Sequence, residues 1–251
     1  MTLRTLTKDT VYATARLVGR RVHSVRAILM YHDVGATGGP DIRLFERQME
    51  VITARSRVVP LRLLPEALHG DGSVTVVTFD DGYATSVETV LPILARHSVE
   101  ATFFLPSGLL GQTFQTSVGP RRLIDEEGAR SLAAAGHEIG GHTLSHPKLT
   151  TVPPAEARRE IERDRDALSA LLDRSVSSFA YPKGDHDDAT RGMVRDAGYR
   201  LAVTVREDLL HGALDPWTLP RVSVNGTMGM SQFAAKLSGG LHVYERFRGR
   251  R

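Results

Sequence analysis

The feature that most constrains the fold is an apolar strand that ends in two carboxylates. Residues 74–79 (VTVVTF) are mostly β-branched, and Asp80, Asp81 and Gly82 follow them directly. β-branched residues favour a strand, whereas two adjacent carboxylates are costly to bury without partners. We therefore expect a strand that runs through a core and delivers Asp80 and Asp81 at its exit, next to groups that compensate their charge.

A second polar stretch, residues 140–147 (GGHTLSHP), offers such groups. His142 and His146 lie four positions apart. On a helical turn this spacing puts both imidazoles on one face, which suits two ligands of a single metal ion. One aspartate and two histidines make three protein ligands, and a catalytic zinc site of that kind keeps one position open for water. The other carboxylate of the Asp80 and Asp81 pair is then free to act as a base.

The two stretches together resemble the polysaccharide deacetylases with a NodB-homology domain, also called carbohydrate esterase family four. The order TFDDG and then HTLSH carries this resemblance, which extends over residues 26–224. It implies that Asp80 is the general base. It also implies that Asp81, His142 and His146 bind the metal.

A third stretch, residues 178–184 (SFAYPKG), is similar to the F-R-P-P-Y-G loop of that family. In the family a backbone N–H of this loop stabilises the oxyanion, and the resemblance gives that role to the amide of Lys183. Ala180 occupies the position at which many members carry an arginine that pairs with the base. The charge partner of Asp80 is therefore expected to be missing or to come from elsewhere.

The general acid is expected at the other end of the domain. The leucine-x-histidine element that carries this acid in most members has no counterpart near the end of the chain. Residues 29–34 (LMYHDV) instead resemble the circularly permuted subgroup that includes the poly-N-acetylglucosamine deacetylases, as does the strand-like run 219–224 (LPRVSV). This resemblance implies that His32 is the general acid. Asp33 or Asp215 could orient its ring, but the sequence around each favours a turn or surface residue.

Strand-like and helix-like segments alternate along the chain and predict an α/β fold. The expected form is a distorted (β/α) barrel of about seven parallel strands, of the NodB-homology type, with the site at the carboxyl ends of the strands. We place the polysaccharide deacetylase domain at residues 26–240, after an N-terminal helical extension at 1–25 and before a basic tail at 241–251. Residues 107–122 lack periodicity and predict a long loop over the active-site end.

Composition narrows the cofactor and the partners. The chain has no cysteine, so a metal must bind histidine and carboxylate ligands, which suit Zn²⁺ first and also Co²⁺, Ni²⁺ or Fe²⁺. No apolar run is long enough to span a membrane, and no secretory leader is recognised, which predicts a cytoplasmic location although family members are often exported. Arginine and lysine are dispersed, which argues against a nucleic-acid partner. Nothing in the sequence specifies the oligomeric state.

The reaction implied by the resemblance is removal of N-acetyl groups from an amino-sugar glycan, with release of acetate. The partner would be an N-acetylglucosamine-type oligosaccharide or polysaccharide, or its precursor. Two other classes stay open, namely a metal-dependent amidase acting on a non-sugar C–N bond and a catalytically silent carbohydrate-binding module. The presence of Asp80 beside the three metal-binding residues argues against the silent module, because binding alone does not require a spare base.

Overall fold

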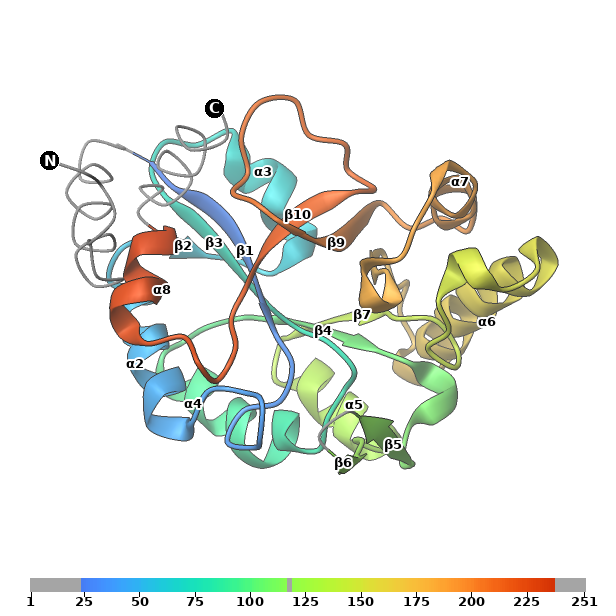
Figure 1. The fold of residues 1–251 in the computed structure, drawn as a ribbon, viewed down its shortest axis with the longest axis horizontal. Helices are drawn as coiled ribbons and strands as arrows, with labels where there is room; N and C mark the ends of the chain where they lie inside the picture. Colours follow the sequence, from blue (N-terminus) through green and yellow to red (C-terminus); the bar gives the residue numbers. More distant parts are fainter. Residues whose placement is uncertain (1–23, 117–118, 238–251) are drawn as a thin grey trace, which may run out of the picture.

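A computed structural model describes residues 24–116 and 119–237. Almost all of the predicted N-terminal extension and the whole basic tail lie outside these residues, so the domain boundaries stay a prediction. The described residues form a closed barrel of parallel strands with helices around it (Figure 1). This arrangement confirms the predicted distorted (β/α) barrel.

The main sheet has eight strands, and pairing between β1 and β3 closes seven of them into a ring. The eighth strand, β2 (Arg57–Val58), pairs with β3 outside the ring. All pairings within this sheet are parallel. In ring order the strands are β1 (Arg26–Tyr31), β10 (Leu219–Ser223), β9 (Leu201–Glu207), β8 (Ser178–Ala180), β7 (Glu138–Gly141), β4 (Thr102–Leu105) and β3 (Val74–Phe79).

Helices pack on the outer face of the barrel (Figure 1). Phe45 of one such helix meets the ring of Tyr31 edge to face, with ring centroids 5.3 Å apart. None of the helices in the described ranges is long and apolar enough to cross a membrane. The helices are α2 (Ile42–Thr53), α3 (Leu64–Leu68), α4 (Leu91–Arg96), α5 (Glu126–Ala134), α6 (Pro154–Leu172), α7 (Asp188–Asp196) and α8 (Met230–Leu237).

Side chains of β3 alternate between the two layers of the core. Val77 and Phe79 belong to the cluster that packs under the helices, whereas Val76 packs with residues of the barrel interior such as Phe104. Because successive residues of a strand point to opposite faces, the row that contains Val76 continues through position 78 to Asp80. The strand therefore directs Asp80 to the inside of the barrel at its carboxyl end.

The register of neighbouring strands brings the predicted site residues to one rim. Tyr31 of β1 is level with Phe79 of β3, so His32 and Asp80 are the next residues on two adjacent strands. Gly141 of β7 pairs with both neighbouring strands, and His142 follows it directly. Parallel strands present their carboxyl ends at the same edge, which explains how residues distant in the sequence meet here.

One connection differs from the predictions. Part of the expected loop at 107–122 forms an antiparallel hairpin of β5 (Thr113–Thr116) and β6 (Gly119–Arg122). Before it in the chain, a π-helical turn (Ser86–Val90) leads into α4, with Pro92 in the first turn of α4. Proline is tolerated there because the amides of a first helical turn have no partner within the helix.

His137, at the start of β7, makes the stability of the fold depend on pH. Its imidazole is 3% exposed, and its Nδ1 accepts a hydrogen bond from the Ala101 amide at 3.2 Å. Burial lowers the pKa of His137 below its usual value, so the unfolded chain takes up this proton first as the pH falls. The contribution to the free energy of unfolding is therefore complete above about pH 6.5 and is lost as the pH falls through the lower folded-state pKa.

We expect the urea midpoint to fall between about pH 7.5 and about pH 5.5, and to fall less in a His137→Asn variant. The amide oxygen of asparagine can still accept from Ala101, but it does not titrate in this range. Both proteins should be measured in chelator, so that metal binding does not add its own pH dependence. An equal fall in the two proteins would contradict the prediction.

Candidate metal centre and catalytic site

The end of β3 separates the two carboxylates of the Asp80 and Asp81 pair. Asp81 and Gly82 both adopt left-handed backbone conformations, each with φ of 69°, and reverse the chain. A Cβ atom at Gly82 would lie only 2.8 Å from the side chain of Leu105, so the reversal requires glycine. The two carboxylates are buried, with 3% exposure for Asp80 and 8% for Asp81, and they have different partners.

Asp81 lies against two imidazoles. Its Oδ1 atom is 3.4 Å from Nε2 of His142 and 3.2 Å from Nε2 of His146. All three residues are buried, and each offers a ligand atom within 4.8 Å of the others. One oxygen and two nitrogen ligands of this kind suit a three-ligand metal site with an open position. The fold therefore brings the three predicted ligands together.

The hydrogen bonding of His142 supports this interpretation. Its Nδ1 atom lies 2.7 Å from the carbonyl oxygen of Ala180. A carbonyl can only accept, so Nδ1 carries a hydrogen, and in the neutral imidazole the lone pair is on Nε2, the atom that faces Asp81. A histidine ligand fixed through its other nitrogen is a common feature of metal sites.

Electrostatics favour an ionised Asp81. Burial opposes ionisation, but hydrogen bonds from His142 and His146 hold the pKa of Asp81 well below its usual range. Burial also lowers the pKa of His146, which favours the neutral imidazole that a metal requires. For His142, burial is outweighed by the hydrogen bond to Asp81 and by both carboxylate charges, which raise its pKa. A proton and a metal ion thus compete for the same lone pairs at low pH.

The histidine stretch is a loop and not the helical turn that its spacing predicts. Thr143 and His146 have φ angles of 66° and 62°, which a right-handed helix does not allow. Two carboxylates of α6 bind backbone amides of the loop instead. Oδ2 of Asp164 accepts from the His142 amide at 2.9 Å, and Glu160 accepts from the amide and the hydroxyl of Ser145, both at 2.8 Å.

Asp164 also connects this loop to the one that follows β4. Its Oδ1 atom accepts from the Ser107 amide at 2.8 Å, so each carboxylate oxygen binds one backbone N–H. The side chain is fully buried, and burial raises the pKa of Asp164 to about 7 even though these amides favour its charged form. The metal-binding loop is therefore held by buried hydrogen bonds from a helix rather than by its own backbone.

Asp80 is paired with a buried arginine. The guanidinium of Arg221 donates two hydrogen bonds of 2.7 Å to the two oxygens of Asp80, and a third of 2.8 Å to the Thr204 carbonyl. Burial alone would raise the pKa of Asp80, but the charge and hydrogen bonds of Arg221 outweigh it and lower the pKa. Asp80 is therefore a carboxylate at neutral pH, and it lies outside the cluster of Asp81 and the two histidines.

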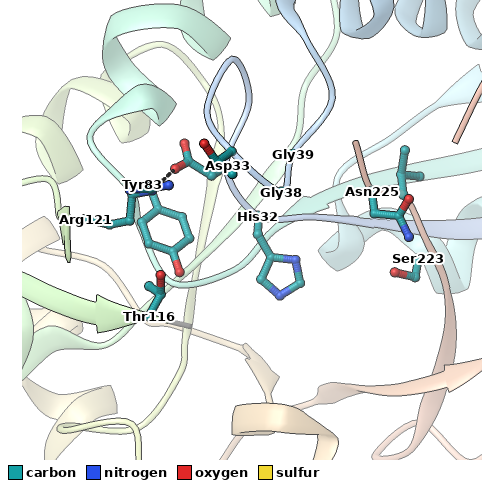
Figure 2. Close-up of a pocket in the computed structure, with 11 residues that line it drawn as sticks. His32, Asp33, Gly38, Gly39, Tyr83, Thr116, Arg121, Ser223 and Asn225 are labelled. Atoms are coloured by element: carbon teal, nitrogen blue, oxygen red, sulfur yellow. Dashed lines mark ion pairs between the residues drawn. The ribbon is translucent and has the colours of Figure 1, made fainter. Parts of the chain in front are cut away.

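His32 lines a cavity of about 300 Å³ beside this cluster. Figure 2 shows its ring between Tyr83 and Thr116 on one side and Ser223 and Asn225 on the other. His32 is exposed, as expected for a group that exchanges protons with a bound molecule.

Neither carboxylate proposed for His32 orients its ring among the described residues. Asp33 accepts from the hydroxyl of Thr85 at 2.5 Å and pairs with Arg121 at 3.2 Å (Figure 2). Asp215 pairs with Arg191 at 2.7 Å. Each of the two carboxylates is thus paired with a neighbouring arginine.

Comparison with known proteins shows the family of this chain. The model of the family described as polysaccharide deacetylase matches residues 69–202, just over half of the chain. The chain belongs to this family. The matched segment contains Asp80, Asp81, His142 and His146, whereas His32 lies before it and Arg221 after it.

Two relatives of this family member match it over most of their length. It is 25% identical over 218 residues to YxkH of Bacillus subtilis, which carries the name of a polysaccharide deacetylase; the match covers 83% of this chain and 74% of YxkH. It is 30% identical over 166 residues to a chitooligosaccharide deacetylase of Sinorhizobium fredii, with 64% of this chain and 67% of that protein covered.

Solved structures share the fold of this family member. IcaB from Ammonifex degensii aligns with a TM-score of 0.76 at 22% identity, and the deacetylase PplD of Streptococcus pyogenes, solved with acetate, aligns with a TM-score of 0.75 at 22% identity. Each alignment covers 86% of this chain and 99% of the other. The barrel closed by the first and last strands is thus a known architecture.

The loop at residues 178–184, which departs from the family pattern at Ala180, has an unusual backbone conformation. Lys183 has a left-handed conformation, with φ of 59°, in the turn Pro182–Gly184. Among the described residues no backbone carbonyl accepts from its amide, whereas the Gly184 amide binds the Tyr181 carbonyl at 2.8 Å. The Lys183 amide is therefore free for a ligand.

The pairing of Arg221 with Asp80 was not predicted from the sequence. The signal was present, because an arginine between Leu219 and Val222 interrupts a strand that is otherwise apolar, and arginine is seldom fully buried without a partner. The register between β9 and β10 shifts between Leu219 and Arg221, and such irregularities re-aim side chains. Arg221 thus supplies the cation that is missing at Ala180, from a different strand of the barrel.

Proposed function

We propose that this protein removes N-acetyl groups from an amino-sugar glycan by metal-dependent hydrolysis and releases acetate. The observation that carries the proposal is that the two adjacent carboxylates at the end of β3 have different partners. Asp81 joins two histidines in a cluster suited to a metal, while Asp80 is held ionised by Arg221 and stays free of that cluster. A binding module would need neither the base nor its buried partner.

Asp81, His142 and His146 would hold the metal, and the donor set suits Zn²⁺, with Co²⁺, Ni²⁺ and Fe²⁺ as alternatives. When bound, such an ion polarises a carbonyl group and lowers the pKa of water. The residues fit this role because the lone pair of His142 faces Asp81 and the pKa of His146 favours its neutral form.

Three other residues would carry out the proton transfers and stabilise the oxyanion. Asp80 would take a proton from the attacking water, because its carboxylate is ionised and reaches the rim of the barrel. The Lys183 amide would donate to the oxyanion that forms on the acetyl carbonyl. His32, on the cavity side, would protonate the departing amine of the sugar.

The cavity beside His32 supports a sugar as the substrate. Its walls include the polar side chains of Thr116, Arg121, Ser223 and Asn225, which together offer donors and acceptors for hydroxyl groups. A volume of about 300 Å³ lies at the lower end for small-molecule sites. The substrate class also agrees with the names of the relatives, which include chitooligosaccharide deacetylases.

The test is acetate release from a series of N-acetylglucosamine oligomers by zinc-loaded protein. We expect release with the loaded protein, none after dialysis against a chelator, and recovery when one equivalent of zinc is returned. Release that survives complete removal of metal would contradict the proposal. Release from small acetamides but from no sugar would instead favour an amidase acting on a non-sugar C–N bond.

A further inference from the structure

The carboxylate of Asp81 has a second hydrogen-bond partner on the side away from the histidines. The hydroxyl of Tyr83 donates to Oδ2 of Asp81 at 2.7 Å, whereas both imidazoles approach Oδ1. Tyr83 is only 6% exposed. The two oxygens of Asp81 are therefore not equivalent, because one faces the metal-binding cluster and the other is occupied by a tyrosine.

The chain reversal after β3 brings this hydroxyl back to Asp81. Asp81 and Gly82 are both left-handed, so the side chain at position 83 folds over the residue two positions before it. Tyr83 also forms a bridge with Leu123, next to the end of the β5–β6 hairpin. On either side of that bridge, the Ile124 amide donates to the Gly82 carbonyl at 2.8 Å and the Ala84 amide donates to the Arg122 carbonyl at 2.9 Å.

We infer that Tyr83 is a positioning residue for the metal centre, which fixes Asp81 as a ligand through Oδ1 alone. The inference rests on the proposed function to the extent that both require a metal at Asp81, His142 and His146. A carboxylate that binds through one oxygen needs its other oxygen satisfied, since a buried unpaired acceptor is costly. Tyr83 meets that need without adding a charge.

The ring of Tyr83 has a second consequence for the site. It forms part of the cavity wall. In Figure 2 the ring of His32 lies between Tyr83 on one side and Ser223 and Asn225 on the other. The same side chain therefore touches the metal ligand with its hydroxyl and the cavity with its ring. A molecule bound in this cavity would therefore lie against the ring whose hydroxyl holds Oδ2 of Asp81.

The experiment compares zinc affinity in Tyr83→Phe and in a matched control, Tyr31→Phe. Both variants lose one buried tyrosine hydroxyl with a hydrogen-bond acceptor, because the Tyr31 hydroxyl donates to Gln48 at 3.0 Å in the core under α2. We expect the Kd for zinc, measured by competition with a chromophoric chelator, to rise about 10–100-fold in Tyr83→Phe. It should stay unchanged in Tyr31→Phe, even if that variant is less stable in urea.

The outcomes separate this inference from the proposed function. An unchanged Kd in Tyr83→Phe, or an equal rise in Tyr31→Phe, would overturn the inference while zinc-dependent acetate release could still be observed. A weaker Kd in Tyr83→Phe alone would support it even if no acetylated sugar proved to be a substrate. Failure of the unchanged protein to bind zinc would overturn both.

Discussion

Replacement of Asp80 by asparagine is expected to lower kcat for acetate release by about 10²–10⁴-fold. The change removes the carboxylate that we propose as the acceptor of the water proton and keeps the size of the side chain. Asp81, His142 and His146 are untouched, so the variant should bind zinc with nearly the affinity of the unchanged protein. The measurements are the initial rate of acetate release from an N-acetylglucosamine oligomer and a zinc titration on the same preparation.

The control for this variant must account for Arg221, which loses its carboxylate partner. Asparagine cannot satisfy Arg221 as a carboxylate does, so the folded fraction has to be measured by circular dichroism before rates are compared. Glu138→Gln is a matched control, since Glu138 is a buried carboxylate that accepts from Ser178 and Thr102 within the barrel, away from the rim. We expect that variant to keep its rate. A zinc-loaded Asp80→Asn protein that retains more than about a tenth of the rate would contradict the role of Asp80.

Replacement of Arg221 by methionine is expected to lower the free energy of unfolding by about 3–5 kcal/mol. Arg221 is fully buried, and its removal leaves the Asp80 carboxylate without its cation inside the barrel. The Thr204 carbonyl also loses a donor. Urea denaturation followed by circular dichroism measures the loss, and deacetylation should fall with it because Asp80 would take up a proton more readily.

The double variant Asp80→Asn/Arg221→Met distinguishes a lost ion pair from a damaged core. It contains no buried charge at this position, so we expect it to be more stable than Arg221→Met alone. Arg96→Met is the surface control, because Arg96 pairs with Glu46 in solvent and should contribute little. If the effects of Asp80→Asn and Arg221→Met simply add in the double variant, the two residues are not coupled.

The architecture and the grouping of Asp81 with two histidines could be predicted because they depend on local patterns. An apolar run that ends in Asp80 and Asp81 is strand-like whatever surrounds it, and strands alternating with helices form few other folds. The parallel register then brings the residues after each strand to one rim, which is why Asp81 and His142 meet although they are distant in sequence. The family resemblance supplied the roles, which the geometry supports as proposals.

The features that could not be predicted depend on contacts across the fold. The spacing of His142 and His146 suits a helix, but Asp164 and Glu160 capture the amides of the stretch and hold it as a loop. No local pattern places Arg221 under Asp80, because that pairing follows from a register shift between two strands. The β5–β6 hairpin was missed for a similar reason, since Pro120 in β6 is unfavourable to a strand and only the partner strand stabilises it.

The closure of the ring also has a consequence for how the protein folds. β1 pairs with β3 nearby in the sequence, but on its other side it pairs with β10, where Leu29 meets Val222. Parallel pairing between such distant segments is costly in entropy, because a long stretch of chain must be ordered before the pairing contributes. Arg221 lies on β10, so Asp80 has its counter-charge only when β10 is paired in the sheet. Closure of the ring and the charge state of Asp80 therefore depend on the same strand.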